Sequence, residues 1–325
     1  MRVFVAGATG AIGRPLVRQL IEGGHQVIGT TRSAAKAERL AEAGATPVVL
    51  DAFDVPALRR AVLEAEPEVV VHQLTALSAP LNPRKYGQWL AQTNRLRQEI
   101  TPVLVQAAEE AGAERLVAQN VSFLLAPRGP WVQDETAPLW HDAPSALRGA
   151  VAACEALERA TLGSARLAGV VLRYGFFYGP GTSYAHNGQI TEMVRRRRYP
   201  VVGKGTAHYS FIHVEDAAEA TVVAARGGQP GVYNVVDDEP APLSQWLPWL
   251  AERLGARPPR RVPAWLARLA VGPHAVMLGE GQRGNSNAKA KDELGWVPRR
   301  PSWRQGLAEA PAGESAPAAN ATRAA

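Results

Sequence analysis

Residues 1–13 read MRVFVAGATGAIG and decide the fold. Residues 2–6 form a short apolar run of strand-forming side chains, and Gly7, Gly10 and Gly13 follow at intervals of three. After them, apolar residues recur at helical spacing. A strand that runs through a glycine turn into a helix lets a diphosphate approach bare backbone and the N-terminus of the helix. The stretch therefore predicts the phosphate-binding turn of a dinucleotide-binding domain.

From residue 26 onward, short apolar runs alternate with helical patterns. The expected strands span residues 26–30, 46–50, 68–72, 115–119, 169–173 and 231–236. The expected helices of the same region span residues 34–43, 55–64, 86–112 and 145–162. This alternation predicts an α/β fold of the Rossmann type, a doubly wound parallel sheet with helices on both faces.

Glycine and proline become frequent after residue 174, which predicts loops that leave the sheet for a smaller lobe. The dinucleotide-binding domain is expected to comprise residues 1–174, completed by 208–238. A mixed C-terminal substrate lobe is expected from residues 175–207 and 239–308. Residues 309–325, rich in alanine and without a periodic apolar face, predict a disordered tail.

The composition limits the class of protein. The 325 residues are 46% hydrophobic and 20% charged, and the net charge of +6 is spread along the chain. No apolar run approaches the roughly 18 residues of a membrane helix, and no basic and aromatic module indicates nucleic-acid binding. The first residues already predict a core strand, so we expect no secretory signal. Cys154 is the only cysteine, so a reducing cytoplasm and no resident metal are expected.

Three further segments carry a resemblance to a known family. Residues 178–181 read YGPG, residues 211–218 read FIHVEDAA and residues 291–298 read KDELGWVP. With the GATGAIG turn, they resemble the signatures of the extended short-chain dehydrogenase/reductase superfamily, the NAD(P)-dependent epimerase/dehydratase-like family. The resemblance implies a chain that binds NAD or NADP and acts on a small molecule held by the second lobe.

The end of the second expected strand bears on the choice of cofactor. Thr31, Arg32 and Ser33 offer a guanidinium and two hydroxyls but no carboxylate. A carboxylate there would bind the ribose hydroxyls of NAD, whereas this set suits a 2′-phosphate. NADP(H) is therefore favoured over NAD(H). In the alternative, Arg32 and Lys36 form only a solvated basic edge.

The resemblance also implies which other residues contact the cofactor. In the opening turn they are Gly7, Thr9, Gly10, Ala11, Ile12 and Gly13. Later in the chain they are Asp51, Ala52, Leu74, Thr75, Ala76, Asn94, Gln119, Tyr174 and Phe176. Of these, Asp51 and Ala52 are expected to border the adenine, and Tyr174 and Phe176 to lie where the nicotinamide docks.

The residues expected to perform the chemistry are missing. Members of the superfamily use a tyrosine and a lysine in the motif Tyr-x-x-x-Lys, in which the lysine also holds a ribose, and this motif occurs nowhere in the sequence. Alignment on Glu155 places Leu147 at the tyrosine and Val151 at the lysine. Neither side chain can exchange a proton, so the family mechanism loses a contribution of roughly 10²–10⁴-fold in rate.

Other residues are candidates for the proton transfer. We take Ser122, after the fifth expected strand, and Tyr178, in the YGPG segment, as the catalytic candidates. Each also has a structural interpretation, Ser122 as a turn residue and Tyr178 as packing within its turn. Further alternatives are Tyr174, Tyr184, His186 and the pair His141 and Asp142.

Three functions follow from this departure. The first is an atypical oxidoreductase that acts on a small carbonyl or hydroxyl metabolite through a non-standard proton donor. The second is a non-redox isomerase or lyase that keeps NADP structurally, and the third is a catalytically silent NADP-binding sensor. The expected partner is a small-molecule substrate, and pairing of the helices expected at 86–112 and 145–162 permits a homodimer.

Overall fold

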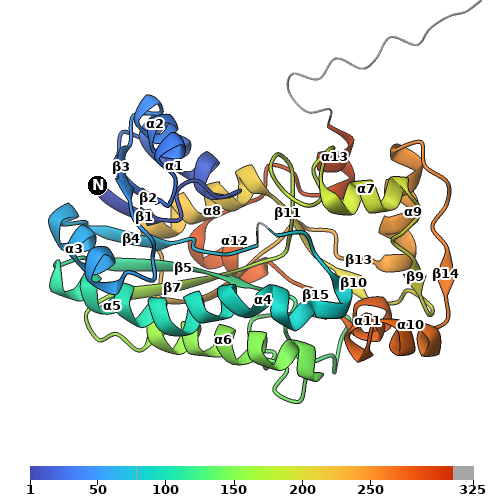
Figure 1. Ribbon diagram of the computed structural model, residues 1–325. Coiled ribbons are helices and arrows are strands. Elements are labelled where there is room, and N and C mark those ends of the chain that lie inside the picture. Colours follow the sequence, from blue (N-terminus) through green and yellow to red (C-terminus); the bar gives the residue numbers. More distant parts are fainter. Residues whose placement is uncertain (78, 310–325) are drawn as a thin grey trace, which may run out of the picture.

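The computed structural model describes residues 1–77 and 79–309 (Figure 1). Its centre is a seven-stranded sheet in the order β12-β7-β5-β4-β1-β2-β3, with every pairing parallel. The strands are β1 (Arg2–Ala6), β2 (Gln26–Thr31), β3 (Thr46–Val49), β4 (Val69–His72), β5 (Arg115–Val121), β7 (Ala168–Tyr174) and β12 (Gly231–Val235). The predicted doubly wound parallel sheet is confirmed. Of the predicted tail, residues 310–325 lie outside the described residues.

Helices cover both faces of this sheet (Figure 1). One face carries α1 (Gly13–Glu22), α2 (Ala34–Glu42), α8 (Val214–Arg226) and α12 (Ala288–Leu294). The other carries α3 (Val55–Ala65), α4 (Tyr86–Arg95), α5 (Thr101–Glu110) and α6 (Ser145–Leu162). No helix among the described residues combines the length and the apolar character that crossing a membrane requires.

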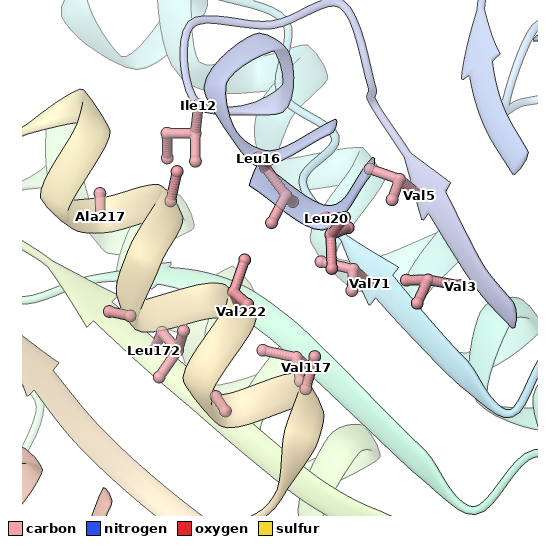
Figure 2. Close-up of a cluster of buried hydrophobic side chains, with 14 of the residues drawn as sticks. Val3, Val5, Ile12, Leu16, Leu20, Val71, Val117, Leu172, Ala217 and Val222 are labelled. Atoms are coloured by element: carbon pink, nitrogen blue, oxygen red, sulfur yellow. The ribbon is translucent and has the colours of Figure 1, made fainter. Parts of the chain in front are cut away.

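Alternation along the strands explains why both faces are covered. Val3 and Val5 of β1 point into the core beneath α1 and α8, whereas Phe4 points into the core beneath α3 and α5. Figure 2 shows the first of these cores, in which Leu16 of α1 and Val222 of α8 lie on the same side of the sheet. Strands buried on both faces read as continuous apolar runs, as residues 2–6 do.

The helix predicted over residues 86–112 forms in three pieces. α4 ends at Arg95, the π-helical turn η2 (Leu96–Ile100) follows, and α5 begins at Thr101. Pro102 lies in the first turn of α5, and its missing N–H interrupts the α-helical hydrogen-bond ladder. The bulge contains Arg97, whose side chain is buried.

The remaining segments form the second lobe, most of it to the right of the sheet in Figure 1. They are η1 (Pro83–Lys85), β6 (Val132–Gln133), β8 (Phe176–Tyr178), α7 (Gln189–Arg195), β9 (Val201–Val202), β10 (His208–Tyr209), β11 (Phe211–His213), β13 (Ala241–Pro242), α9 (Leu243–Arg253), β14 (Arg261–Val262), α10 (Ala264–Ala270), α11 (Pro273–Val276), η3 (Met277–Gly281), β15 (Gly284–Asn285) and α13 (Trp303–Ala308). The short strands pair two by two. They surround an aromatic core in which Phe211 and Trp246 are fully buried.

Candidate functional site

A large cleft opens along the carboxyl ends of the strands. Its volume is about 1670 Å³, and its walls come from the connections after β1 to β5 and β7, from α4 and from the second lobe. In the sheet, β1 lies between β4 and β2, so the strand order reverses there. Dinucleotides bind in the crevice at this type of reversal.

The turn after β1 has the backbone geometry that a diphosphate needs. Gly7 has a φ of +94°, and a Cβ at this position would lie 2.8 Å from the backbone of Gln73. A Cβ at Gly13 would collide with the carbonyl oxygen of Gly7. The N–H of Gly10 donates to that same carbonyl oxygen at 3.2 Å, which closes the turn. Side chains would fill this cradle, so its shape fits a nicotinamide dinucleotide.

Cationic side chains line the end of the cleft beside β2. Arg32, Lys36 and Arg39 lie there, and none of them forms an ion pair with another described residue. The acid of this region is Asp51, whose carboxylate accepts the backbone N–H of Phe53 at 3.0 Å. Three free cations against one carboxylate make this end attractive to a polyanionic group.

Most residues that were expected to contact the cofactor line this cleft. They are Gly7, Thr9, Gly10, Ala11, Ile12, Gly13, Thr31, Arg32, Asp51, Ala52, Leu74, Thr75, Ala76, Gln119 and Phe176. They come from six separate strand ends, which the parallel sheet brings to one edge. Their direct contact with a cofactor stays a prediction.

Three members of the predicted cofactor set do not line the cleft. Tyr174 is fully buried, and its hydroxyl shares a 2.6 Å hydrogen bond with Thr221 of α8, because alternation along β7 directs it into the core. Asn94 turns its amide toward α6, where its Oδ1 is buried without a hydrogen-bond partner. Ser33 precedes α2 and donates its backbone N–H to Thr31 Oγ1 at 3.3 Å. Their contact with a cofactor therefore has no support from the lining of the cleft and stays a prediction.

Neither catalytic candidate lines the cleft. Ser122 is fully buried with its hydroxyl unpartnered, while its neighbours Val121 and Phe123 line the wall. Tyr178 is fully buried beneath Gly306 of α13 and lies edge-on to His213, with ring centroids 5.2 Å apart. Burial raises the pKa of the Tyr178 phenol. A side chain without access to the cleft cannot donate a proton to a substrate there.

Among the alternative proton donors, some lie outside the cleft and one lines it. His186 is exposed and hydrogen-bonded to Arg195 at 3.1 Å. His141 is exposed, and Asp142 is paired with Arg128 at 2.5 Å. Of the alternatives, Tyr184 lines the cleft, and burial raises the pKa of its phenol well above the usual value.

The wall of α6 that should carry the tyrosine and lysine is apolar. Leu147, Ala150 and Val151 are almost fully buried and belong to a hydrophobic cluster with Leu124 and Met277. Ala150 reaches the cleft surface. The wall therefore offers no acid or base to a bound substrate.

Aromatic rings dominate the part of the cleft beneath the second lobe. They belong to Tyr86, Trp89, Phe123, Phe176, Tyr184, Tyr199, Tyr209 and His274. Tyr86 stacks on His274 with centroids 5.6 Å apart. Burial raises the pKa of Tyr86 to about 12. This region can enclose a flat, unsaturated molecule.

Arg14 and Arg97 are among the arginines of the cleft that the sequence patterns did not single out. Arg14, in the first turn of α1, lines the cleft and extends toward Gly181. Arg97, in η2, lines the cleft although its residue is only 4% exposed. In the sequence, Arg97 interrupts the apolar face of residues 96–108. A charge at such a position was the signal that could have pointed to it.

Comparisons with known proteins agree with this architecture. A sequence model of the NAD dependent epimerase/dehydratase family matches residues 3–235, from β1 to the end of β12. The crystal structure of a UDP-glucose 4-epimerase from Thermotoga maritima, solved with UDP-glucose, superposes with a TM-score of 0.74. The superposition covers 95% of this chain and 96% of the epimerase. At 23% sequence identity, it shows that the two chains share a fold.

Two curated relatives are named as reductases. The 3-diazoavenalumate denitrifying reductase of a Streptomyces species is 48% identical over 308 residues, which cover 94% of this chain and 99% of the relative. The 4-hydroxy-2-methyl-3-oxo-4-farnesyl-3,4-dihydroquinoline-1-oxide ketoreductase of Stigmatella aurantiaca is 28% identical and covers 79% of this chain and 74% of the relative. These relatives support an NAD(P)-dependent oxidoreductase. By its fold, its sequence signatures and these matches, the chain belongs to the NAD dependent epimerase/dehydratase family of extended short-chain dehydrogenases/reductases.

Proposed function

We propose that this chain is an NADPH-dependent reductase that replaces the diazo group of an aromatic, anionic substrate with hydrogen. The relative that is 48% identical carries a diazo compound and a denitrifying reduction in its name. The apolar wall of α6 at Leu147, Ala150 and Val151 is the observation that carries the proposal. It supports a reduction that takes no proton from the protein.

The chemistry of the diazo group explains why no acid is needed. When bound, a reduced nicotinamide supplies a hydride and is itself oxidised. Delivered to the carbon of an aryl diazonium cation, that hydride would form a C–H bond as the C–N bond breaks and dinitrogen leaves as a neutral molecule. The positive charge of the diazonium cancels the negative charge of the hydride. Reduction of a carbonyl group, by contrast, leaves an alkoxide that must gain a proton.

The aromatic region of the cleft supports a flat cationic head on the substrate. The π faces of Tyr86, Trp89 and Tyr199 attract a cation that lies against them. Arg198 is a charged side chain that lines this region, whereas the lining acids, Asp51 and Glu215, lie on the dinucleotide side. An aromatic molecule with a diazonium group and a carboxylate matches this distribution.

The choice of NADPH rests on the end of the cleft beside β2. Arg32, Lys36 and Arg39 lie free of ion pairs among the described residues, and β2 ends without an acid. These cations suit a 2′-phosphate, which adds up to two negative charges to the adenosine ribose. The expected cytoplasmic location and the homodimer through α4, α5 and α6 also stay proposals.

Carbonyl reduction is the second candidate, because one of the alternative proton donors does line the cleft. Tyr184 lines it beneath the second lobe, and the Stigmatella aurantiaca relative is named as a ketoreductase. Burial raises the pKa of the Tyr184 phenol, which makes it a weak proton donor. The diazo reaction is therefore the better supported of the two.

A substrate comparison tests the proposal. The purified chain is mixed with NADPH deuterated at nicotinamide C4, on the transferred face, and with either 3-diazoavenalumate or a panel of ketones and aldehydes. We expect NADPH oxidation with the diazo compound, one dinitrogen released per NADPH, and one deuterium on the product carbon that carried nitrogen. A Gly7→Ala variant, which should not bind the dinucleotide, measures the uncatalysed reaction of the diazonium.

Other outcomes select the other functions. NADPH oxidation with carbonyl compounds alone contradicts the diazo reaction and favours Tyr184 as the donor. A bound cofactor that stays reduced while a substrate is converted favours the non-redox enzyme. A bound cofactor with no converted substrate favours the sensor.

A further inference from the structure

Arg97 is a buried cation without a partner among the described residues. It lies in η2, its residue is 4% exposed, and its guanidinium makes no hydrogen bond or ion pair with any residue in the described ranges. The same side chain lines the cleft. Its neighbour Arg95, by contrast, is exposed and paired with Glu99 at 2.7 Å.

A charge in this position points to a ligand. Burying an arginine without a compensating acceptor is costly, and buried charges in folded proteins are normally paired or hydrogen-bonded. Arg97 lines the cleft, and its guanidinium carries five N–H donors. The missing acceptors are therefore expected on whatever fills the cleft beside Arg97.

The surroundings of Arg97 place it between the sheet and α6. Its charge adds to burial in lowering the pKa of His72, the last residue of β4. The same charge offsets part of the effect of burial, which raises the pKa of Cys154 in α6. Side chains on a helix slant toward its N-terminus. Since Tyr86 at the start of α4 lines the cleft, this slant directs the guanidinium toward the carboxyl edge of the sheet.

The strand order tells which part of a dinucleotide lies there. A diphosphate on the turn after β1 leaves one nucleoside over β2 and β3, at Arg32 and Asp51, and the other over β4 and β5. The sugar of that second nucleoside follows the diphosphate directly and lies nearest β4. The ring beyond it reaches Val121 and Phe176, which line the cleft after β5 and β7.

We propose that Arg97 donates hydrogen bonds to the hydroxyls of the ribose that carries the nicotinamide, and so anchors the reactive half of the dinucleotide. The cation that α6 lacks is supplied by the facing helical turn η2. Ala150 and Val151 carry short apolar side chains, and α6 contacts η2. The inference rests on the proposed function only in requiring that a nicotinamide dinucleotide binds.

Calorimetric binding to the full chain tests this assignment without turnover. Two ligands are titrated: NADPH, and adenosine 2′,5′-bisphosphate, which lacks the nicotinamide half. We expect Arg97→Met to weaken NADPH at least about tenfold, the effect of losing a hydrogen bond from a charged group, and to leave the bisphosphate within twofold. Arg97→Lys should retain part of the NADPH affinity. Arg198→Met is the matched control, since Arg198 lines the same cleft but is exposed, and it should leave both affinities unchanged.

The remaining outcomes overturn the assignment. NADPH affinity that is unchanged in Arg97→Met, with a raised KM for the substrate, would move Arg97 to a substrate anion. An equal loss of affinity for both ligands would indicate that the substitution damages the whole cleft. The melting temperature of each ligand-free variant shows whether such damage is present. Should Arg97→Met not fold, Arg97→Gln is titrated in its place. A failed diazo reaction alongside the predicted affinities would overturn the proposed function and keep the role of Arg97.

Discussion

The α-carbon of Gly7 packs directly on the backbone of Gln73, so that a methyl group at Gly7 would lie 2.8 Å from the carbonyl carbon and oxygen of Gln73. This contact joins the turn after β1 to the connection after β4. Both connections line the cleft. The same α-carbon thus fixes the shape of the proposed diphosphate cradle and the distance between its two walls.

Gly7→Ala should therefore destabilise the fold and abolish dinucleotide binding. The positive φ of +94° and the close contact each destabilise an alanine at this position. Together they should lower the free energy of unfolding by roughly 2 to 4 kcal/mol. Gly24→Ala is the control, because Gly24 has a φ of +75° but no atom within 4 Å of an added Cβ. It should cost roughly 1 to 2 kcal/mol and leave binding intact. Urea unfolding and NADPH titration measure both, and equal effects in the two variants would contradict the contact.

Arg32→Asp should reverse the preference between the two dinucleotides. A carboxylate at the end of β2 repels the 2′-phosphate of NADPH and can accept hydrogen bonds from the ribose hydroxyls of NADH. We expect the Kd for NADPH to rise roughly 100-fold, from the loss of about two charge-assisted hydrogen bonds, while the Kd for NADH is unchanged or lower. Arg166→Asp makes the same change of charge at an exposed residue away from the cleft lining, and it should alter neither Kd. Equal weakening of both dinucleotides by Arg32→Asp would sink the assignment of NADP.

Tyr178→Phe should leave the reaction unchanged. The Tyr178 hydroxyl is buried, has no hydrogen-bond partner in the part of the chain that the structure describes, and lies outside the cleft. Removing an unpartnered buried hydroxyl costs little, and the free energy of unfolding should stay equal or rise by up to about 1 kcal/mol. The value of kcat/KM should stay within twofold of the wild type. A drop of 100-fold or more would show that Tyr178 reaches the substrate after all.

The local pattern of the sequence was enough to predict the parallel sheet and the glycine turn. Strand, turn and helix are adjacent in residues 1–22, and their chemistry depends on backbone alone. The direction of single side chains was harder to predict. Ser122 lies between two residues that line the cleft. Because side chains alternate along a strand, an error of one position in the alignment moves Ser122 from the core to the cleft. Tyr178 is covered by α13, which lies more than 120 residues later in the chain.

Arg97 could not be assigned from its own helix for a similar reason. Its position within an apolar face was visible in the sequence, but its meaning depends on the apolar surface of α6 at Ala150 and Val151. The π-helical turn before Pro102 also changes which residues of the predicted 86–112 helix point inward. The role of Arg97 could be inferred only once its packing against α6 and the change of helical phase at the π-helical turn were known.

His72 should make the fold sensitive to acid. Burial, with help from Arg97, lowers the pKa of His72 to about 3 from its usual 6.5, so the unfolded chain binds a proton more readily between these values. Stability is therefore full above pH 6.5 and falls as pH decreases toward 3, by about 2 kcal/mol between pH 7 and pH 5. Urea unfolding at the two pH values should show this loss in the wild type. His72→Gln should remove most of it, and an equal loss in the variant would assign the effect to other groups.

The rate of hydride transfer to the diazo substrate should not depend on pH between 6 and 9. The proposed reaction takes no proton from the protein, and the shifted pKa values of Tyr86, about 12, and His72, about 3, lie outside this range. Single-turnover rates with saturating NADPH measure the chemical step, and the ionisation of the substrate itself is followed by its absorbance. A donor such as Tyr184 keeps its proton over this range, because burial raises the pKa of its phenol well above the usual value, so a substitution tests it directly. If Tyr184 donated the proton, Tyr184→Phe would slow the reaction roughly 10²–10⁴-fold. With the diazo substrate, we expect Tyr184→Phe to change the rate less than about threefold, since its ring and its packing against Trp246, 5.9 Å between centroids, are kept. A loss of roughly 100-fold or more in Tyr184→Phe would show that the cleft does supply a proton, and the diazo reaction would lose its main support.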